Sequence, residues 1–170
     1  LYPDLIVGDM DSVNPELLNK YVSKGVPVRK VPVMKDETDT ELAALAAVEL
    51  GADKIVLLGA LGSRFDHSYA NVMVLVKLAQ LNIDAMILSS HNRIMVSSKM
   101  LILHSAQGST VSLLPLGENV RIASTKGLYY PVASKAMPLD TPYGISNIFT
   151  DEIAEVVIES GWLMAVIAED

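Results

Sequence analysis

The hydrophobic pattern of the chain changes about halfway along its length, and this change constrains the fold more than any other feature. Up to about residue 92, short apolar runs typical of strands alternate with longer segments of helical periodicity. That order favours a mostly parallel sheet flanked by helices, because the crossover between two parallel strands places a helix over a face of the sheet. We expect these strands at residues 4–7, 28–33, 54–58 and 85–88.

Two helices are predicted most clearly in this first half. Thr38 and Glu41 are spaced as a capping box, and Gly51 supplies a stop signal, so a helix is expected between Thr38 and Gly51. A second helix is predicted from about Asp66 to Leu81, with Asp66 as its N-cap. The apolar face of this second helix contains Val72, Leu75, Val76 and Ala79.

Beyond residue 92 the helical periodicity disappears, and short strand candidates follow one another. They are separated by turn signals at Gly108, 117–119, 126–127, 142–144 and 160–161. Such spacing is typical of an antiparallel β-sandwich. We therefore expect an α/β part at residues 1–92, incomplete at its N-terminus, and a β-sandwich domain at residues 93–170.

The composition limits the classes of partner. With 51% hydrophobic residues in 170, the chain can build a real core, and a net charge of −7 argues against nucleic acid or an anionic membrane as the main partner. The absence of cysteine excludes disulfides and thiolate metal sites and agrees with a cytoplasmic location. No apolar stretch is long enough to span a bilayer. Because the chain starts without Met and enters a strand almost at once, we expect a segment upstream.

Two carboxylates follow the first apolar run, in the stretch LIVGDMDSV. If the chain stayed extended, Asp9 and Asp11 would point to the same side, with Cα atoms about 7 Å apart. Two like charges held so close need a cation or a shared proton. This pair is therefore the first candidate for a functional site.

Two further charged clusters stand where a strand passes into a helix. Lys35 and Asp39 belong to KDETDTE, whereas Arg64, Asp66 and His67 belong to GALGSRFDH. The carboxyl ends of strands in an open parallel sheet line one crevice, where ligands bind. Hard oxygen ligands favour Mg²⁺ shared with phosphates, and Lys35 and Arg64 would neutralise phosphate oxygens. No glycine-rich phosphate loop is present in the sequence, so a nucleotide site here must use metal and side chains.

Each of these residues also has a purely structural interpretation. Asp39 can simply complement a helix dipole, Asp66 can be only an N-cap, and Lys35 can be a solvated surface lysine. His91 and His104 are interpreted as surface histidines and receive no function. The conjunction of three charged clusters at three strand-to-helix junctions is what favours a site.

The motifs, taken together, resemble those of the thiamine pyrophosphokinase family. The stretches that carry the resemblance, in order, are DLIVGDMDS, KDETDTELA, GALGSRFDHSYANV, SLLPL, GLYYP and GISN. The resemblance implies ATP-dependent transfer of pyrophosphate to thiamine, which gives thiamine diphosphate and AMP. It also implies an α/β catalytic domain followed by a β-sandwich. Family members are homodimers, with thiamine between the catalytic domain of one subunit and the sandwich of the other.

Carried over position by position, the resemblance implies roles for particular residues. Asp9, Asp11 and Asp39 would handle Mg²⁺ and phosphate, and Asp66 would join them as a catalytic carboxylate. Asp39 and Asp66 are both candidates to accept the proton of the thiamine hydroxyl. The implied nucleotide contacts are Lys35, Thr38, Arg64 and His67, and the implied thiamine contacts are Tyr130, Ser146 and Asn147. The family also has an upstream motif of the DGG type, which has no counterpart in this sequence.

Three alternative functions stay open at the level of the sequence. A phosphatase of the haloacid dehalogenase type also sets Asp-x-Asp after an apolar strand and would use Asp9 as a covalent nucleophile, although its downstream lysine and acidic pair are not evident. A non-catalytic thiamine- or nucleotide-binding protein is a second alternative. A pyrophosphokinase that acts on a pterin-like alcohol is a third, because its metal chemistry would be the same.

Overall fold

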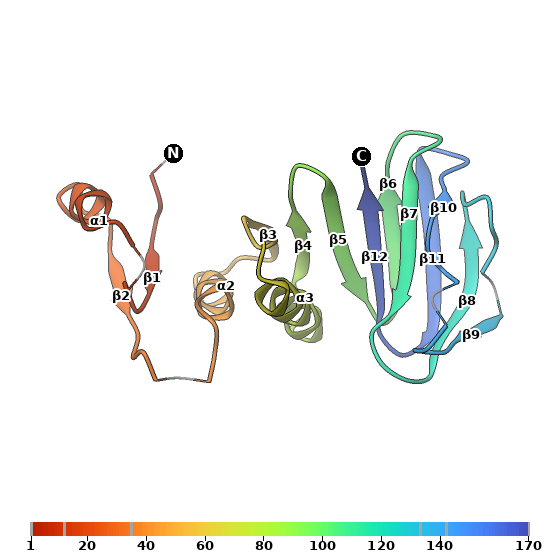
Figure 1. The fold of residues 1–170 in the computed structure, drawn as a ribbon, viewed down its shortest axis with the longest axis horizontal. Helices are drawn as coiled ribbons and strands as arrows, with labels where there is room; N and C mark the ends of the chain where they lie inside the picture. Colours follow the sequence, from red (N-terminus) through yellow and green to blue (C-terminus); the bar gives the residue numbers. More distant parts are fainter. Residues whose placement is uncertain (1, 12, 35, 133, 142, 170) are drawn as a thin grey trace. The chain divides into compact units, whose positions relative to one another are not determined.

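The computed structural model describes residues 2–11, 13–34, 36–132, 134–141 and 143–169 (Figure 1). The chain divides into two compact units, Leu1–Asp53 and Lys54–Asp170. The boundary predicted at residue 92 differs from this division, so the functional division into residues 1–92 and 93–170 stays a prediction.

The first unit contains a pair of parallel strands and two helices. Its elements are β1 (Ile6–Gly8), α1 (Pro15–Val22), β2 (Val28–Lys30) and α2 (Asp39–Glu49). β1 pairs with β2 in parallel, and α2 contacts β1. The helix α1 connects two parallel strands, which is the crossover that the alternating pattern predicts.

Helix α2 confirms the capping signals of the sequence. The Oγ1 of Thr38 accepts the backbone N–H of Glu41 at 3.2 Å, as expected of an N-cap. At the other end, Gly51 has φ +93° and donates its N–H to Val48, while Ala52 donates to Ala47. These two bonds form a Schellman motif, which places Gly51 at the left-handed position after the helix.

The second unit combines one helix with two sheets. The helix is α3 (Phe65–Gln80). The larger sheet has the order β10-β7-β12-β5-β4-β3 and contains β3 (Lys54–Leu58), β4 (Asp84–Leu88), β5 (Asn92–Ser97), β7 (Thr110–Pro115), β10 (Asn147–Ile148) and β12 (Leu163–Ala168). The smaller sheet has the order β6-β11-β8-β9 and contains β6 (Met100–His104), β8 (Val120–Lys126), β9 (Lys135–Met137) and β11 (Ile153–Ser160).

The prediction of a mostly parallel sheet is wrong. Among the described strands, only β1–β2 and β3–β4 pair in parallel, and the other pairs are antiparallel. The reversal comes directly after β4, where Ser89 and Asn92 close a short turn with a 2.8 Å backbone hydrogen bond. β5 therefore returns antiparallel to β4, and one sheet runs without interruption past residue 92. Apolar periodicity reports that a strand is buried and carries no information on its direction.

The larger sheet of the second unit is covered on both faces. On β12, Leu163, Ala165 and Ile167 belong to the core shared with the smaller sheet. The alternate residues Met164 and Val166 pack in a second core with α3. This alternation follows from the two-residue period of a strand. The predicted β-sandwich is therefore present, with α3 as an additional layer.

Helix α3 uses the predicted apolar face. Val72 and Leu75 are buried in the core with the larger sheet, and Val76 packs against that core. The helix ends with Asn82 at φ +59°, and Ile83 donates its N–H to Leu78, as in a Schellman motif. No helix in the described ranges is both long enough and apolar enough to cross a membrane.

Candidate active site

The loop after β1 carries the first pair of predicted site residues. β1 ends at Gly8, and Met10 adopts a left-handed conformation with φ +67°. The Oδ1 of Asp9 accepts the backbone N–H of Asp11 at 3.1 Å, a local turn that aspartate favours. The expectation of an extended chain through Asp11 is therefore wrong, because the chain turns and the side chain of Asp9 is part of that turn.

Asp39 lies against the end of the same strand. A Cβ atom built on Gly8 would stand 3.3 Å from the Oδ2 of Asp39, so the carboxylate lies close to Gly8. Gly8 itself has φ +153°, a conformation that favours glycine. Asp39 is also in the first turn of α2, where a negative charge complements the helix dipole. The fold of the first unit thus brings Asp39 beside the residue that precedes Asp9.

The donor atoms at this place are of the kind that suits Mg²⁺. Magnesium is usually bound through one or two carboxylates, with phosphate oxygens and water completing its coordination. Within the described ranges, no three His, Cys, Asp or Glu side chains are gathered closely enough to hold a metal by themselves. In this part of the chain Asp9, Asp11 and Asp39 are thus not gathered as a set of three metal ligands, and their role in binding Mg²⁺ together with phosphate stays a prediction. Lys35 lies outside the described residues.

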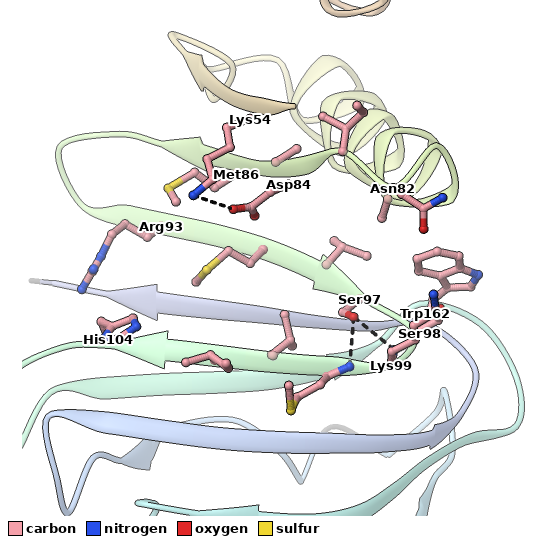
Figure 2. Close-up of a pocket in the computed structure, with 18 residues that line it drawn as sticks. Lys54, Asn82, Asp84, Met86, Arg93, Ser97, Ser98, Lys99, His104 and Trp162 are labelled. Atoms are coloured by element: carbon pink, nitrogen blue, oxygen red, sulfur yellow. Dashed lines mark hydrogen bonds and ion pairs between the residues drawn. The ribbon is translucent and has the colours of Figure 1, made fainter. Parts of the chain in front are cut away.

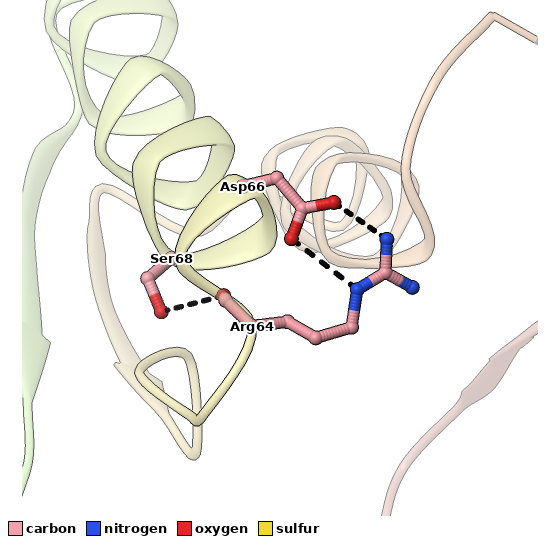
Figure 3. A network of polar contacts seen from close by, with 3 residues as sticks. All are labelled: Arg64, Asp66 and Ser68. Atoms are coloured by element: carbon pink, nitrogen blue, oxygen red, sulfur yellow. Dashed lines mark hydrogen bonds and ion pairs between the residues drawn. The ribbon is translucent and has the colours of Figure 1, made fainter.

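Arg64 and Asp66 form a two-pronged ion pair at the start of α3 (Figure 3). The Nη2 of Arg64 donates to Oδ2 of Asp66 at 2.5 Å, and Nε donates to Oδ1 at 3.2 Å. Ser68 supports the turn, because its Oγ donates to the carbonyl of Arg64 at 3.2 Å. The prediction of Asp66 as N-cap is wrong: α3 begins at Phe65, and Arg64 occupies the N-cap position without a side-chain capping bond.

The ion pair changes the charge properties of both groups. The hydrogen bond from Arg64 is the largest cause that lowers the pKa of the Asp66 carboxyl. The same bond raises the pKa of the Arg64 guanidinium. Both side chains are largely exposed, at 69% and 64%, so a phosphate anion has access to the guanidinium from solvent. His67, the next residue, is also exposed.

The predicted thiamine contacts lie in the second unit, around β10. Asn147 is 3% exposed, and its side chain bonds to the backbone of Tyr130. Ser146 is exposed, has φ +58° and donates its backbone N–H to the Oγ of Ser112 at 3.2 Å. The structure therefore brings Tyr130 and Asn147 into direct contact.

The sequence reasoning missed Asn71 and included Gly144 only as part of the GISN turn. Asn71 on α3 is buried and donates from Nδ2 to the carbonyl of Ala60 at 2.8 Å, which ties the loop after β3 to the helix. Gly144 packs so closely on β7 that an added Cβ would meet the carbonyl oxygen of Leu113 at 2.0 Å. The signal for Asn71 was a polar residue next to apolar helix positions, and the signal for Gly144 was the first letter of GISN.

A groove of about 750 Å³ in the second unit lies away from these residues (Figure 2). Its lining includes Lys54, Met86, Arg93 and His104, and none of the predicted site residues. Lys54 reaches Asp84 there at 3.9 Å. The volume of a groove alone therefore does not identify the candidate site of this chain.

Comparisons with known proteins point to one family. The family model described as "Thiamin pyrophosphokinase, catalytic domain" matches residues 1–87, and the model described as "Thiamin pyrophosphokinase, vitamin B1 binding domain" matches residues 93–163. Thiamine pyrophosphokinase 1 of Oryza sativa subsp. japonica is 30% identical over 169 residues, which cover 93% of this chain and 63% of the relative. Thiamine pyrophosphokinase of Bacillus subtilis is 29% identical over 143 residues, which cover 82% of this chain and 66% of the relative.

Solved structures share the fold. The crystal structure of thiamine pyrophosphokinase from Bacillus subtilis superposes with a TM-score of 0.88 at 23% identity, over 100% of this chain and 80% of that one. Thiamin pyrophosphokinase from Geobacillus thermodenitrificans gives a TM-score of 0.85 at 28% identity, over 99% of this chain and 78% of that one. The chain spans a little under two thirds of the length of the first curated relatives that it matches. Because two family models together match most of its residues in sequence order, the chain belongs to the thiamin pyrophosphokinase family.

Proposed function

We propose that the protein transfers pyrophosphate from ATP to the hydroxyl of thiamine, giving thiamine diphosphate and AMP. The observation that carries this proposal is the match of both family models in order, a catalytic domain over residues 1–87 and a vitamin B1 binding domain over residues 93–163. The chain thus contains segments related to both halves of such an enzyme. The reaction needs mainly positioning and cancellation of charge on phosphate oxygens.

The carboxylates of the first unit serve the phosphate side of this proposal. Asp9, Asp11 and Asp39 would hold Mg²⁺, which when bound neutralises charge on the phosphate oxygens. The position of the Asp39 carboxylate near Gly8 supports this assignment, because Gly8 directly precedes the loop that carries the other two carboxylates. The turn in which Asp9 accepts the N–H of Asp11 also gives that loop a defined shape.

Arg64 would bind a phosphate oxygen through its planar guanidinium. Asp66 would hold the guanidinium in orientation through the two hydrogen bonds described above. The lowered pKa makes the Asp66 carboxylate a weaker base than an ordinary aspartate. Asp39 and Asp66 both stay proposed as acceptors of the thiamine proton. Thr38 and His67 stay proposed nucleotide contacts, and the hydroxyl of Thr38 already accepts the N–H of Glu41.

The second unit would select thiamine. Thiamine carries a cationic thiazolium ring, which exposed aromatic faces attract. Tyr130 is exposed, and Ser146 is exposed and directly precedes Asn147, which bonds to the backbone of Tyr130; this supports both as contacts. We also propose a homodimer in which thiamine binds between the catalytic part of one subunit and the sandwich of the other, in the cytoplasm.

The test is to incubate the full-length protein with ATP, Mg²⁺ and thiamine, and to separate the products by chromatography. We expect AMP and thiamine diphosphate in equal amounts, and neither product when thiamine or Mg²⁺ is omitted. Release of inorganic phosphate with a labelled acyl-phosphate on Asp9 would support a phosphatase instead. Calorimetric binding of thiamine without any turnover would support a binding protein. Transfer to a pterin-like alcohol and not to thiamine would change the assigned substrate.

A further inference from the structure

Residues 127–130 run side by side with residues 147–150, a segment that begins with β10. Thr150 donates its backbone N–H to Gly127 at 2.9 Å, Leu128 forms an isolated bridge with Phe149, and Tyr129 donates to Ile148 at 2.9 Å. These contacts form a short antiparallel ladder. Hydrogen-bonded pairs alternate with non-hydrogen-bonded pairs in an antiparallel ladder, so the backbone of Asn147 would not bond to that of Tyr130, the next pair after Tyr129 and Ile148.

The backbone of Tyr130 is bound by a side chain instead. The Oδ1 of Asn147 accepts the N–H of Tyr130 at 3.0 Å, and its Nδ2 donates to the carbonyl of Tyr130 at 2.7 Å. The amide of asparagine has the same donor and acceptor as a peptide group, so it can satisfy both backbone groups of one residue. The main chain itself leaves the ladder here, because Ser146 is left-handed with φ +58°.

The amide of Asn147 has little capacity left for a ligand. Its Oδ1 also accepts the N–H of Ile148 at 2.9 Å, so both lone pairs of the oxygen are engaged. The residue is 3% exposed, and its backbone belongs to β10, which pairs with β7. A substrate bound at the surface would meet the side chains beside Asn147 before it met this amide.

Those neighbouring side chains are two exposed tyrosines. The rings of Tyr129 and Tyr130 are 63% and 57% exposed and meet edge to face, with centroids 4.8 Å apart and planes at 86°. Exposed aromatic groups in fixed orientation suit a flat cationic ring, through stacking and cation–π attraction. Asn147 fixes the backbone from which one of the two rings projects.

We infer that Asn147 is a positioning residue, which sets the ring of Tyr130 for a flat heteroaromatic cation and does not itself touch the substrate. This inference rests on the proposed function, because thiamine is the cation in question. It replaces the direct contact to thiamine that the sequence motif implied for Asn147.

The first measurement uses hydrogen exchange, which does not depend on activity. In the wild-type protein the amide of Tyr130 should be protected, because its N–H is bonded to Asn147. Asn147→Ala should speed its exchange at least tenfold while leaving the amides of the β12 core protected. Asn147→Leu keeps the size of the side chain but removes the acceptor of the Tyr130 N–H, and it serves if the alanine variant does not fold. An unchanged rate at Tyr130 in a folded variant would overturn the inference.

The second measurement separates the substrates by their Michaelis constants. Asn147→Ala should raise the KM for thiamine about five- to thirty-fold, with the KM for ATP nearly unchanged. The matched control is Thr125→Val, which removes the 3.3 Å bond from the N–H of Val132 in the same loop and should leave the KM for thiamine unchanged. A fall in melting temperature without a change in the KM for thiamine would reduce Asn147 to a structural residue.

A double-mutant cycle tests whether Asn147 acts through Tyr130. In a Tyr130→Ala background, Asn147→Ala should raise the KM for thiamine no further, since the ring that it positions is gone. Additive effects would instead show a direct contact between Asn147 and thiamine. If the wild-type protein neither binds nor converts thiamine, the proposed function fails. If the wild-type protein converts thiamine but Asn147→Ala leaves the KM for thiamine unchanged, only the positioning role is overturned.

Discussion

At the scale of single residues, the loop after β1 carries two of the carboxylates that are proposed to handle phosphate. Gly8 lets the chain turn at φ +153°, and the carboxylate of Asp39 occupies the space that a side chain at position 8 would need. Asp9 then closes the turn by accepting the N–H of Asp11. Its carboxylate therefore has both a structural and a proposed chemical task, and the two can be separated by an isosteric amide.

Asp9→Asn is expected to lower turnover by orders of magnitude while the folded structure is retained. The amide oxygen can still accept the N–H of Asp11, but the negative charge proposed to bind Mg²⁺ is lost. Steady-state kinetics at saturating ATP and thiamine, together with circular dichroism, would measure both effects. Asp4→Asn, a change at an exposed aspartate before β1, is the matched control and should keep wild-type turnover. Equal turnover in the two variants would exclude Asp9 from the chemistry.

The ion pair of Arg64 and Asp66 gives a prediction about pH. Because the pKa of Asp66 is lowered in the folded protein, the pair contributes above the pKa of the unfolded carboxyl and is lost as the pH falls through the folded value. A carboxyl titration by NMR should give a midpoint below the ordinary value of 3.8 for Asp66. In Arg64→Gln the midpoint should move up towards that value.

The control for this titration is Lys54→Gln. Lys54 pairs with Asp84 and has no part in the network at the start of α3, so the Asp66 midpoint should not move. Activity changes between pH 6 and 8 then cannot come from Asp66, which stays charged throughout that range. A midpoint for Asp66 that is the same with and without Arg64 would show that the pair does not persist in solution.

At the scale of elements, both ends of α2 were predicted correctly, whereas the direction of the strands after β4 was not. The N-cap Thr38 and the stop at Gly51 act within a few residues of each other, so a local pattern contains all the information needed. The direction of β5 depends on the turn after β4 and on its pairing with β12, a strand far along the chain. The N-cap of α3 lies two residues before the predicted Asp66, because Arg64 takes the cap position without the side-chain bond by which a cap is recognised.

Thr38→Ala should destabilise the first unit by about 1 kcal/mol, since the N–H of Glu41 loses its acceptor. Thr40→Ala in the first turn of the same helix is the matched control, because alanine is the better helix former and no capping position is lost. Urea unfolding followed by far-UV circular dichroism would measure the difference. Equal midpoints for the two variants would mean that the cap contributes nothing to α2.

At the scale of the whole molecule, the sequence predicted an α/β part, a sandwich and the family, but it could not predict how the elements join. The cores show why: β12 supplies alternate residues to two different packing layers, so one strand serves both the helix and the sandwich. The candidate site was predicted through its motifs, whereas the bond of Asn147 to Tyr130 could not be, since it joins two residues 17 positions apart in the sequence. Only the folded chain places such partners together.

The final prediction tests whether the site is shared between two subunits of the proposed homodimer. If thiamine binds between the catalytic part of one subunit and the sandwich of the other, a hybrid dimer can contain one site built from two unmutated halves. Mixing inactive Asp9→Asn/Asp11→Asn protein with Tyr130→Ala/Ser146→Ala protein should then restore part of the wild-type turnover. With random subunit exchange half of the dimers are hybrids and each has one intact site of two, so about one quarter of the wild-type activity is expected. Subunit exchange is verified by mass spectrometry of differently tagged chains. Exchange without recovered activity would place the whole site within a single chain.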